Sequence, residues 1–129
     1  MNDKEFIEVI RTRPGVFGLN GSFYPTAMFL EGFDTGRSGG LLRGFREWLV
    51  LRRGERCSLQ WPLLVLQEAL PGIDAGRWKQ PDLLTADQEG RAVDQLFSLV
   101  LEFLDIQSDA RRLARMYAEF EALYATTVE

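Results

Sequence analysis

The sequence contains no histidine, and Cys57 is its only cysteine. The missing histidine removes the side chain whose ordinary pKa suits proton transfer near neutral pH, and also the commonest metal ligand in proteins. Ser–His and Cys–His nucleophile pairs are therefore excluded. A single cysteine cannot supply the ligands of a structural zinc site. We expect a protein that is not an enzyme and holds no metal or cofactor; catalysis by carboxylates or lysine is a distant alternative.

Long apolar runs are also missing. None approaches the roughly 20 residues that a membrane-spanning helix needs, and the first five residues lack the basic start and apolar core of a signal peptide. With one cysteine there can be no intrachain disulfide, so nothing in the sequence indicates an oxidising compartment. We expect a cytoplasmic protein that does not associate with membranes.

Charge is unevenly distributed along the chain. The 129 residues have a formal net charge of −4 and an isoelectric point of about 4.9. Residues 1–56 carry a net charge of +2, and residues 57–129 carry −6. Nucleic-acid binding depends on basic contacts to phosphates, so no nucleic-acid partner is expected. An acidic body would instead steer the approach of a basic protein.

The pattern of apolar residues predicts helices throughout. Hydrophobic residues make up 46% of the chain and charged residues 26%, which is typical of one globular domain spanning 1–129. Alternation with period two never persists over five residues, so strands are not expected. We predict an all-α, single-domain bundle of about six helices, near residues 3–11, 22–36, 41–53, 60–70, 85–107 and from 109 onward.

The helix near 85–107 is expected to be central. Its apolar stripe is wide enough to be contacted from several sides. Thr85 and Gln88 form a capping-box pattern at its start, and Asn2 with Glu5 gives a similar signal at the first helix. Gly54 is expected to end the third helix.

Two motifs could be mistaken for nucleotide-binding loops. Residues 11–18 resemble a loop near the start of gyrase-type ATPase domains, but nothing downstream resembles the rest of that fold. We interpret Pro14 and Gly15 as a helix stop, with Phe17 packing inward. Residues 36–40 could suggest a phosphate cradle, but no Gly-Lys-Ser/Thr follows. An interhelical loop is the favoured interpretation.

The polar face of the 85–107 helix is the main candidate site. Its carboxylates could form a solvated face or a partner-binding face. An acid–base pair or a metal site is the least favoured interpretation. Leu101 lies beside two of them on a helical wheel, which favours a partner. Trp78, between two cations in the long 71–84 connection, could cover the core or anchor an interface. The candidate partner-binding residues are Asp87, Asp94, Leu101, Glu102, Asp105 and Trp78.

About the first 60 residues resemble a group of small bacterial proteins. The resemblance rests on three segments, residues 6–18 (FIEVIRTRPGVFG), 29–33 (FLEGF) and 44–49 (GFREWL), with Val16 and Phe17 in place of the group's commoner Met-Tyr. It implies an immunity protein, which binds and neutralises one cognate toxin. The acidic composition adds the expectation that binding uses an acidic surface and that the toxin is basic. Specificity would then lie in the acidic 82–109 region. The alternative is a helical adaptor or small-ligand-binding module without a toxin partner.

Overall fold

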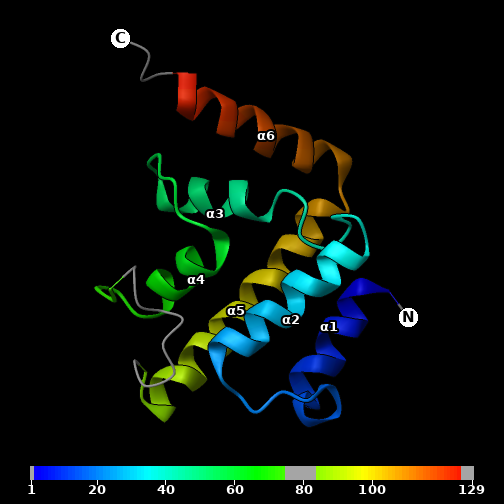
Figure 1. The fold of residues 1–129 in the computed structure, drawn as a ribbon. Helices are drawn as coiled ribbons and strands as arrows, with labels where there is room; N and C mark the ends of the chain where they lie inside the picture. The colour runs from blue at the N-terminus through cyan, green and yellow to red at the C-terminus, as the bar shows by residue number, and fades with distance from the viewer. Residues whose placement is uncertain (1, 75–83, 126–129) are drawn as a thin grey trace.

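The computed structural model describes residues 2–74 and 84–125. Within these ranges all the regular secondary structure is helical, with no strand, so the predicted all-α fold is confirmed (Figure 1). The elements are α1 (Asp3–Thr12), the 3₁₀ helix η1 (Pro14–Phe17), α2 (Phe23–Gly36), α3 (Phe45–Arg53), α4 (Trp61–Ala69), α5 (Ala86–Gln107) and α6 (Ala110–Ala125).

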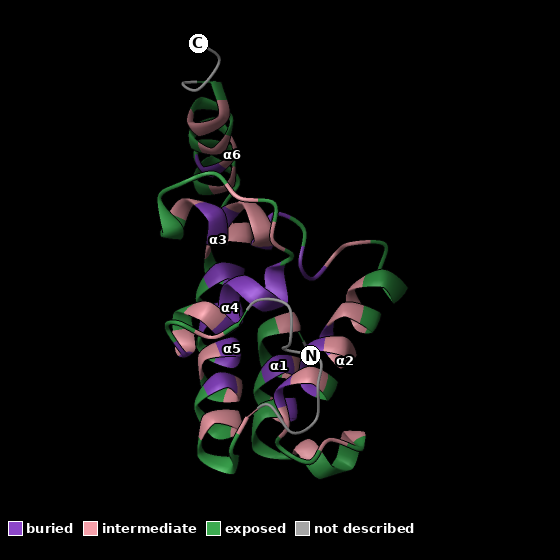
Figure 2. Cartoon of the chain, turned by 60° about the vertical axis from the view of Figure 1, so that its left-hand side comes forward, coloured by how far each residue is buried: buried purple, intermediate pink, exposed green. Residues whose placement is uncertain are grey.

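The longest helix, α5, is the centre of the bundle, as its wide apolar stripe predicts. It contacts α1, α2, α3, α4 and α6. In Figure 1, α6 lies across one end of the molecule beside α3. Figure 2 shows that buried residues concentrate where α3, α4 and α5 meet, whereas α6 is mostly exposed or half-buried. Met116 is the buried residue of α6.

An aromatic cluster joins three helices at the core. The ring centroid of Phe45 lies 5.5 Å from that of Phe103 and 5.6 Å from that of Trp61. Trp48 is 5.6 Å from Phe103. Such tilted and edge contacts add about 0.5–1.5 kcal/mol per pair to the burial of the rings. The cluster therefore fixes α3 against α5 and α4.

Two helix starts form as the local sequence predicts. The side-chain oxygen of Asn2 accepts a hydrogen bond from the backbone N–H of Glu5 at 2.8 Å. Thr85 and Gln88 complete a reciprocal capping box at the start of α5. Each pair satisfies amide donors that the first helical turn leaves without partners.

The start of α3 is later than predicted, because a carboxylate from α2 organises the preceding turn. One oxygen of Asp34 accepts hydrogen bonds from the backbone N–H groups of Leu41 and Leu42, at 3.1 and 2.7 Å. These two N–H groups already donate hydrogen bonds to Asp34, so they are not free to bind a phosphate. The interhelical-loop interpretation of residues 36–40 fits this arrangement.

Gly44 ends the same turn at a close approach to α6. Its φ angle is +91°, a conformation that favours glycine. A Cβ atom there would lie 3.0 Å from Tyr117 Oη, 3.1 Å from Met116 Cε and 3.2 Å from Phe103 Cζ. The missing side chain lets α6 pack over the turn.

The Arg-Pro-Gly segment ends a helix, as expected. α1 stops at Thr12, and Pro14 opens η1. Phe17 packs between Phe6 and Phe29, with centroid distances of 5.7 and 5.6 Å. Its ring is only half-buried, and the neighbouring Val16 is 74% exposed. The turn thus packs its aromatic side chain against the fold but keeps one apolar side chain in solvent.

Candidate functional site

The solvent-facing side of α5 carries the four carboxylates that the sequence singles out. Asp87, Asp94, Glu102 and Asp105 are all exposed. From Asp87 to Asp105 the helix rises about 27 Å, at roughly 1.5 Å per residue. Because α5 is held by its contacts with the other helices, these side chains extend from a fixed backbone. We call these four residues and the surface around them the α5 face.

Cations reduce the charge of the α5 face. The ion pairs are Asp87 with Arg91 at 3.3 Å, Glu102 with Arg52 at 3.7 Å and Asp105 with Lys4 at 3.0 Å. Within residues 2–74 and 84–125, Asp94 makes no ion pair. Two of the three cations come from α1 and α3, so the face is less acidic than residues 82–109 alone indicate.

Arg52 connects the α5 face to its surroundings. Its guanidinium pairs with Glu68 of α4 and lies 5.0 Å from the ring centroid of Trp48. The hydrogen bond to Glu68 is the main cause that raises the pKa of Arg52 above its ordinary value, and the charges of Glu68 and Glu102 add to it. Arg52 is therefore a permanent cation committed to contacts within the protein.

Leu101 requires a correction. The sequence places it beside Asp94 and Asp105 as an exposed apolar residue, but it is only 9% exposed and belongs to the core. The expectation of an exposed Leu101 is wrong because α5 has neighbours on so many sides that the covered sector extends beyond its apolar stripe. Trp78, the other proposed anchor, lies outside the described residues.

Two further acidic residues of this region have structural roles. Glu89 accepts a hydrogen bond from the backbone N–H of Phe23 at 2.5 Å, which caps α2, whose own Ser22 makes no side-chain cap. Asp109 accepts from the backbone N–H groups of Arg111 and Arg112 at 3.0 and 3.2 Å, at the start of α6. Both carboxylates stabilise helix N-termini, which accounts for part of the acidic composition without a partner.

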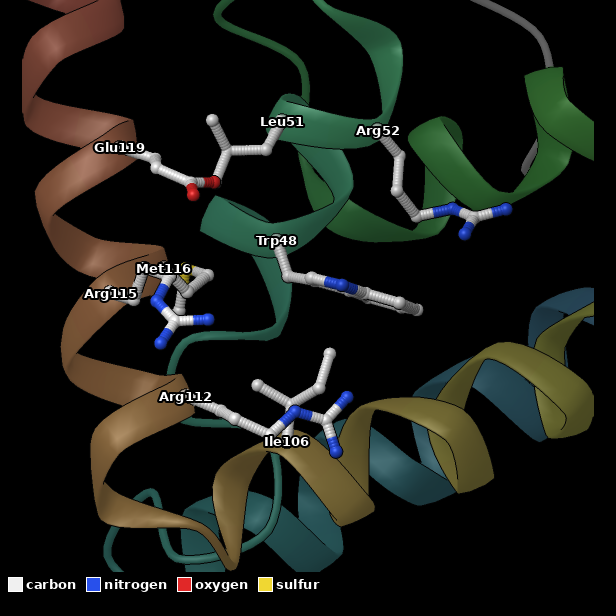
Figure 3. A pocket seen from close by; sticks show the side chains of 8 residues that line it. All are labelled: Trp48, Leu51, Arg52, Ile106, Arg112, Arg115, Met116 and Glu119. Atoms are coloured by element: carbon white, nitrogen blue, oxygen red, sulfur yellow. The ribbon is translucent and has the colours of Figure 1, made fainter.

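A shallow groove of about 290 Å³ lies where α3, α5 and α6 meet (Figure 3). Figure 3 shows Arg112 and Arg115 extending from α6 toward the space beside Trp48. The lining residues are Trp48, Leu51, Arg52, Ile106, Arg112, Arg115, Met116 and Glu119.

Sequence reasoning missed this groove. Arg112 and Arg115 are three residues apart, so they share one side of α6, and that spacing is a visible signal. Their approach to Trp48 and Ile106 depends on how α6 crosses α3 and α5. Nothing local in the sequence specifies that crossing.

The described residues show no metal-ligand cluster, no unpartnered buried polar side-chain atom and no helix fit to span a membrane. Among residues 2–74 and 84–125, no three Cys, Asp or Glu side chains lie where they could hold a metal ion. In the same ranges, every buried polar side-chain atom has a hydrogen-bond partner. None of the helices described there combines the length and apolar character of a membrane span.

Comparison with protein-family models, curated proteins and solved structures finds no match to this chain. The resemblance to immunity proteins therefore rests on the three N-terminal segments alone and stays a prediction.

Proposed function

We propose that this chain is an immunity-type protein that binds and neutralises a cognate bacterial toxin. The carboxylates of the α5 face would bind a basic surface of that toxin. The observation that carries the proposal is the α5 face, on which Asp87, Asp94, Glu102 and Asp105 are all exposed along one helix. Its length of about 27 Å suits a standard interface of roughly 800 Å² per partner. The N-terminal resemblance supplies the toxin-neutralising role.

The ion pairs on the α5 face do not block such a partner. Exposed salt bridges contribute about 0–1 kcal/mol, so a lysine or arginine of the toxin can replace Lys4 or Arg91 at small cost. Asp94, which makes no ion pair with a described residue, is the first contact we assign. Charge complementarity of this kind acts mainly on the association rate.

The proposal includes the compartment of the protein and the absence of catalytic activity. We place the protein in the cytoplasm, where it would meet a toxin before damage occurs, and we assign it no catalytic activity, metal or cofactor. Trp78 is a further proposed partner-binding residue, since aromatic side chains dominate many interfaces.

The test is binding to the products of genes adjacent to the one that encodes this chain. We expect one product to be toxic when expressed alone and to lose toxicity when this chain is expressed with it. Asp94→Lys should slow association by about 3- to 10-fold at low ionic strength and by less at high ionic strength, because salt screens the interaction.

The matched control is Glu121→Lys, an equal change of charge at an exposed position of α6. It should leave the association rate within about 2-fold, because a charge outside the contact contributes little to the approach of the partner. Equal effects of the two variants would remove the α5 face from the interface. If no neighbouring product binds, the toxin-neutralising role is wrong and the adaptor hypothesis takes its place.

A further inference from the structure

The groove between α3, α5 and α6 is opposite in sign to the α5 face. Arg112 and Arg115 are exposed on its rim, and neither forms an ion pair with any described residue. Arg52, the third arginine, is held by Glu68 and Glu102. Two uncommitted guanidinium groups thus stand at one opening of a protein whose net charge is −4.

The floor of the groove is apolar. Leu51 and Ile106 are half-buried and reach the surface, while Trp48 and Met116 are 7% and 4% exposed. At about 290 Å³, the groove lies below the usual range of drug-sized ligand sites, roughly 300–1,000 Å³. It has room for one or two side chains of a partner.

We propose that this groove docks an acidic segment of a partner protein. An apolar side chain of the segment would pack against Leu51 and Ile106, and its flanking carboxylates would bind Arg112 and Arg115. Guanidinium groups bind carboxylates through paired, charge-assisted hydrogen bonds, and arginine is enriched at protein interfaces. The inference does not depend on a toxin, because the partner of this groove is acidic whereas the partner proposed for the α5 face is basic.

The surrounding carboxylates favour a peptide over a nucleic acid. Glu119 lines the same groove, and Glu102 and Glu68 lie beside Arg52. A continuous phosphate backbone would meet these negative charges along its whole length. Separate carboxylates spaced by an apolar side chain avoid the repulsion and fill the groove.

The probe is a synthetic peptide with leucine at helical spacing and glutamate between, about four helical turns long, since shorter helices are marginal in water. Matched peptides replace every glutamate by lysine or every leucine by serine, and oligothymidylate serves as the polyanion. Binding is followed by fluorescence anisotropy, and its location by the shift of the Trp48 indole N–H resonance in ¹⁵N-labelled protein.

We expect the Glu/Leu peptide to bind with a Kd below about 1 mM and to shift the Trp48 resonance. The double variant Arg112→Glu/Arg115→Glu should weaken binding at least about 10-fold, because like charges then face each other. The neutral pair Arg112→Gln/Arg115→Gln should be intermediate. Arg111→Glu, on the same turn but outside the groove, should stay within about 2-fold.

Several results would overturn the inference. The inference is wrong if the Glu/Leu peptide does not bind. It is also wrong if the Lys/Leu peptide, the Glu/Ser peptide or oligothymidylate binds equally well, or if Arg111→Glu weakens binding as much as the double variant does. Since Arg111, Arg112 and Arg115 are all exposed, far-UV circular dichroism should show every variant folded. A folded double variant with unchanged affinity would place the peptide elsewhere.

Discussion

Replacing Gly44 by alanine tests how the turn before α3 supports α6. The new Cβ has two costs. At φ +91°, a side chain in left-handed backbone costs about 1–2 kcal/mol. The Cβ would also stand 3.0 Å from Tyr117 Oη and 3.1 Å from Met116 Cε, and overpacking of this kind costs about 1–3 kcal/mol. We expect Gly44→Ala to lower the free energy of unfolding by about 2–5 kcal/mol.

Gly54→Ala is a matched control. Gly54 has a nearly identical φ of +84°, but nothing lies within 4 Å of the position its Cβ would take. It should lose only the backbone cost, about 1–2 kcal/mol. The difference between the two variants therefore isolates the contact with α6.

The assay is urea unfolding followed by far-UV circular dichroism, with the slope of each transition compared to confirm that the same structure unfolds. Tyr117→Phe in the Gly44→Ala background should recover part of the loss, because it removes the oxygen nearest the new Cβ. Equal losses for Gly44→Ala and Gly54→Ala would refute the close packing of α6 on this turn.

Three further substitutions test the packing of the Arg-Pro-Gly turn and the capping of α2. Phe17→Ala should cost about 1–3 kcal/mol, below the 3–5 expected for a fully buried ring, because Phe17 is half-buried beside Phe6 and Phe29; Val16→Ala should change stability by less than about 0.5 kcal/mol. Glu89→Ala should cost about 1–2 kcal/mol by removing the cap of α2. Denaturant unfolding measures all three, and a neutral Glu89→Ala would show that the hydrogen bond to Phe23 does not stabilise the helix.

The sequence predicts those features whose causes are local. Asn2 and Thr85 cap their own helices, and Gly54 ends one, so period and capping pattern suffice to find them. The central position of α5 follows from the width of its apolar stripe. These properties need no knowledge of which helix lies beside which.

Features that depend on distant residues are missed. Asp34 delays the start of α3 by bonding two amides seven and eight residues away, and Glu89 caps a helix that begins 66 residues earlier. Leu101 is covered because several helices surround α5, which a single helical wheel cannot show. These are consequences of tertiary packing.

The candidate site also combines features that the sequence predicts with features that depend on distant residues. The carboxylates of the α5 face are found from spacing alone. The spacing does not predict their ion pairs with Lys4 and Arg52, since these cations lie on α1 and α3. The groove of Arg112 and Arg115 is missed for a related reason, because its floor comes from helices distant in sequence.

The α5 face is tested most directly by carboxyl footprinting of the complex with the toxin that a neighbouring gene supplies. Carboxylates are labelled by carbodiimide coupling and quantified by mass spectrometry, free and bound. We predict that Asp87 and Asp94 lose most of their labelling in the complex while Glu121 keeps its own. Unchanged labelling of Asp87 and Asp94 in a saturated complex would contradict the proposed interface.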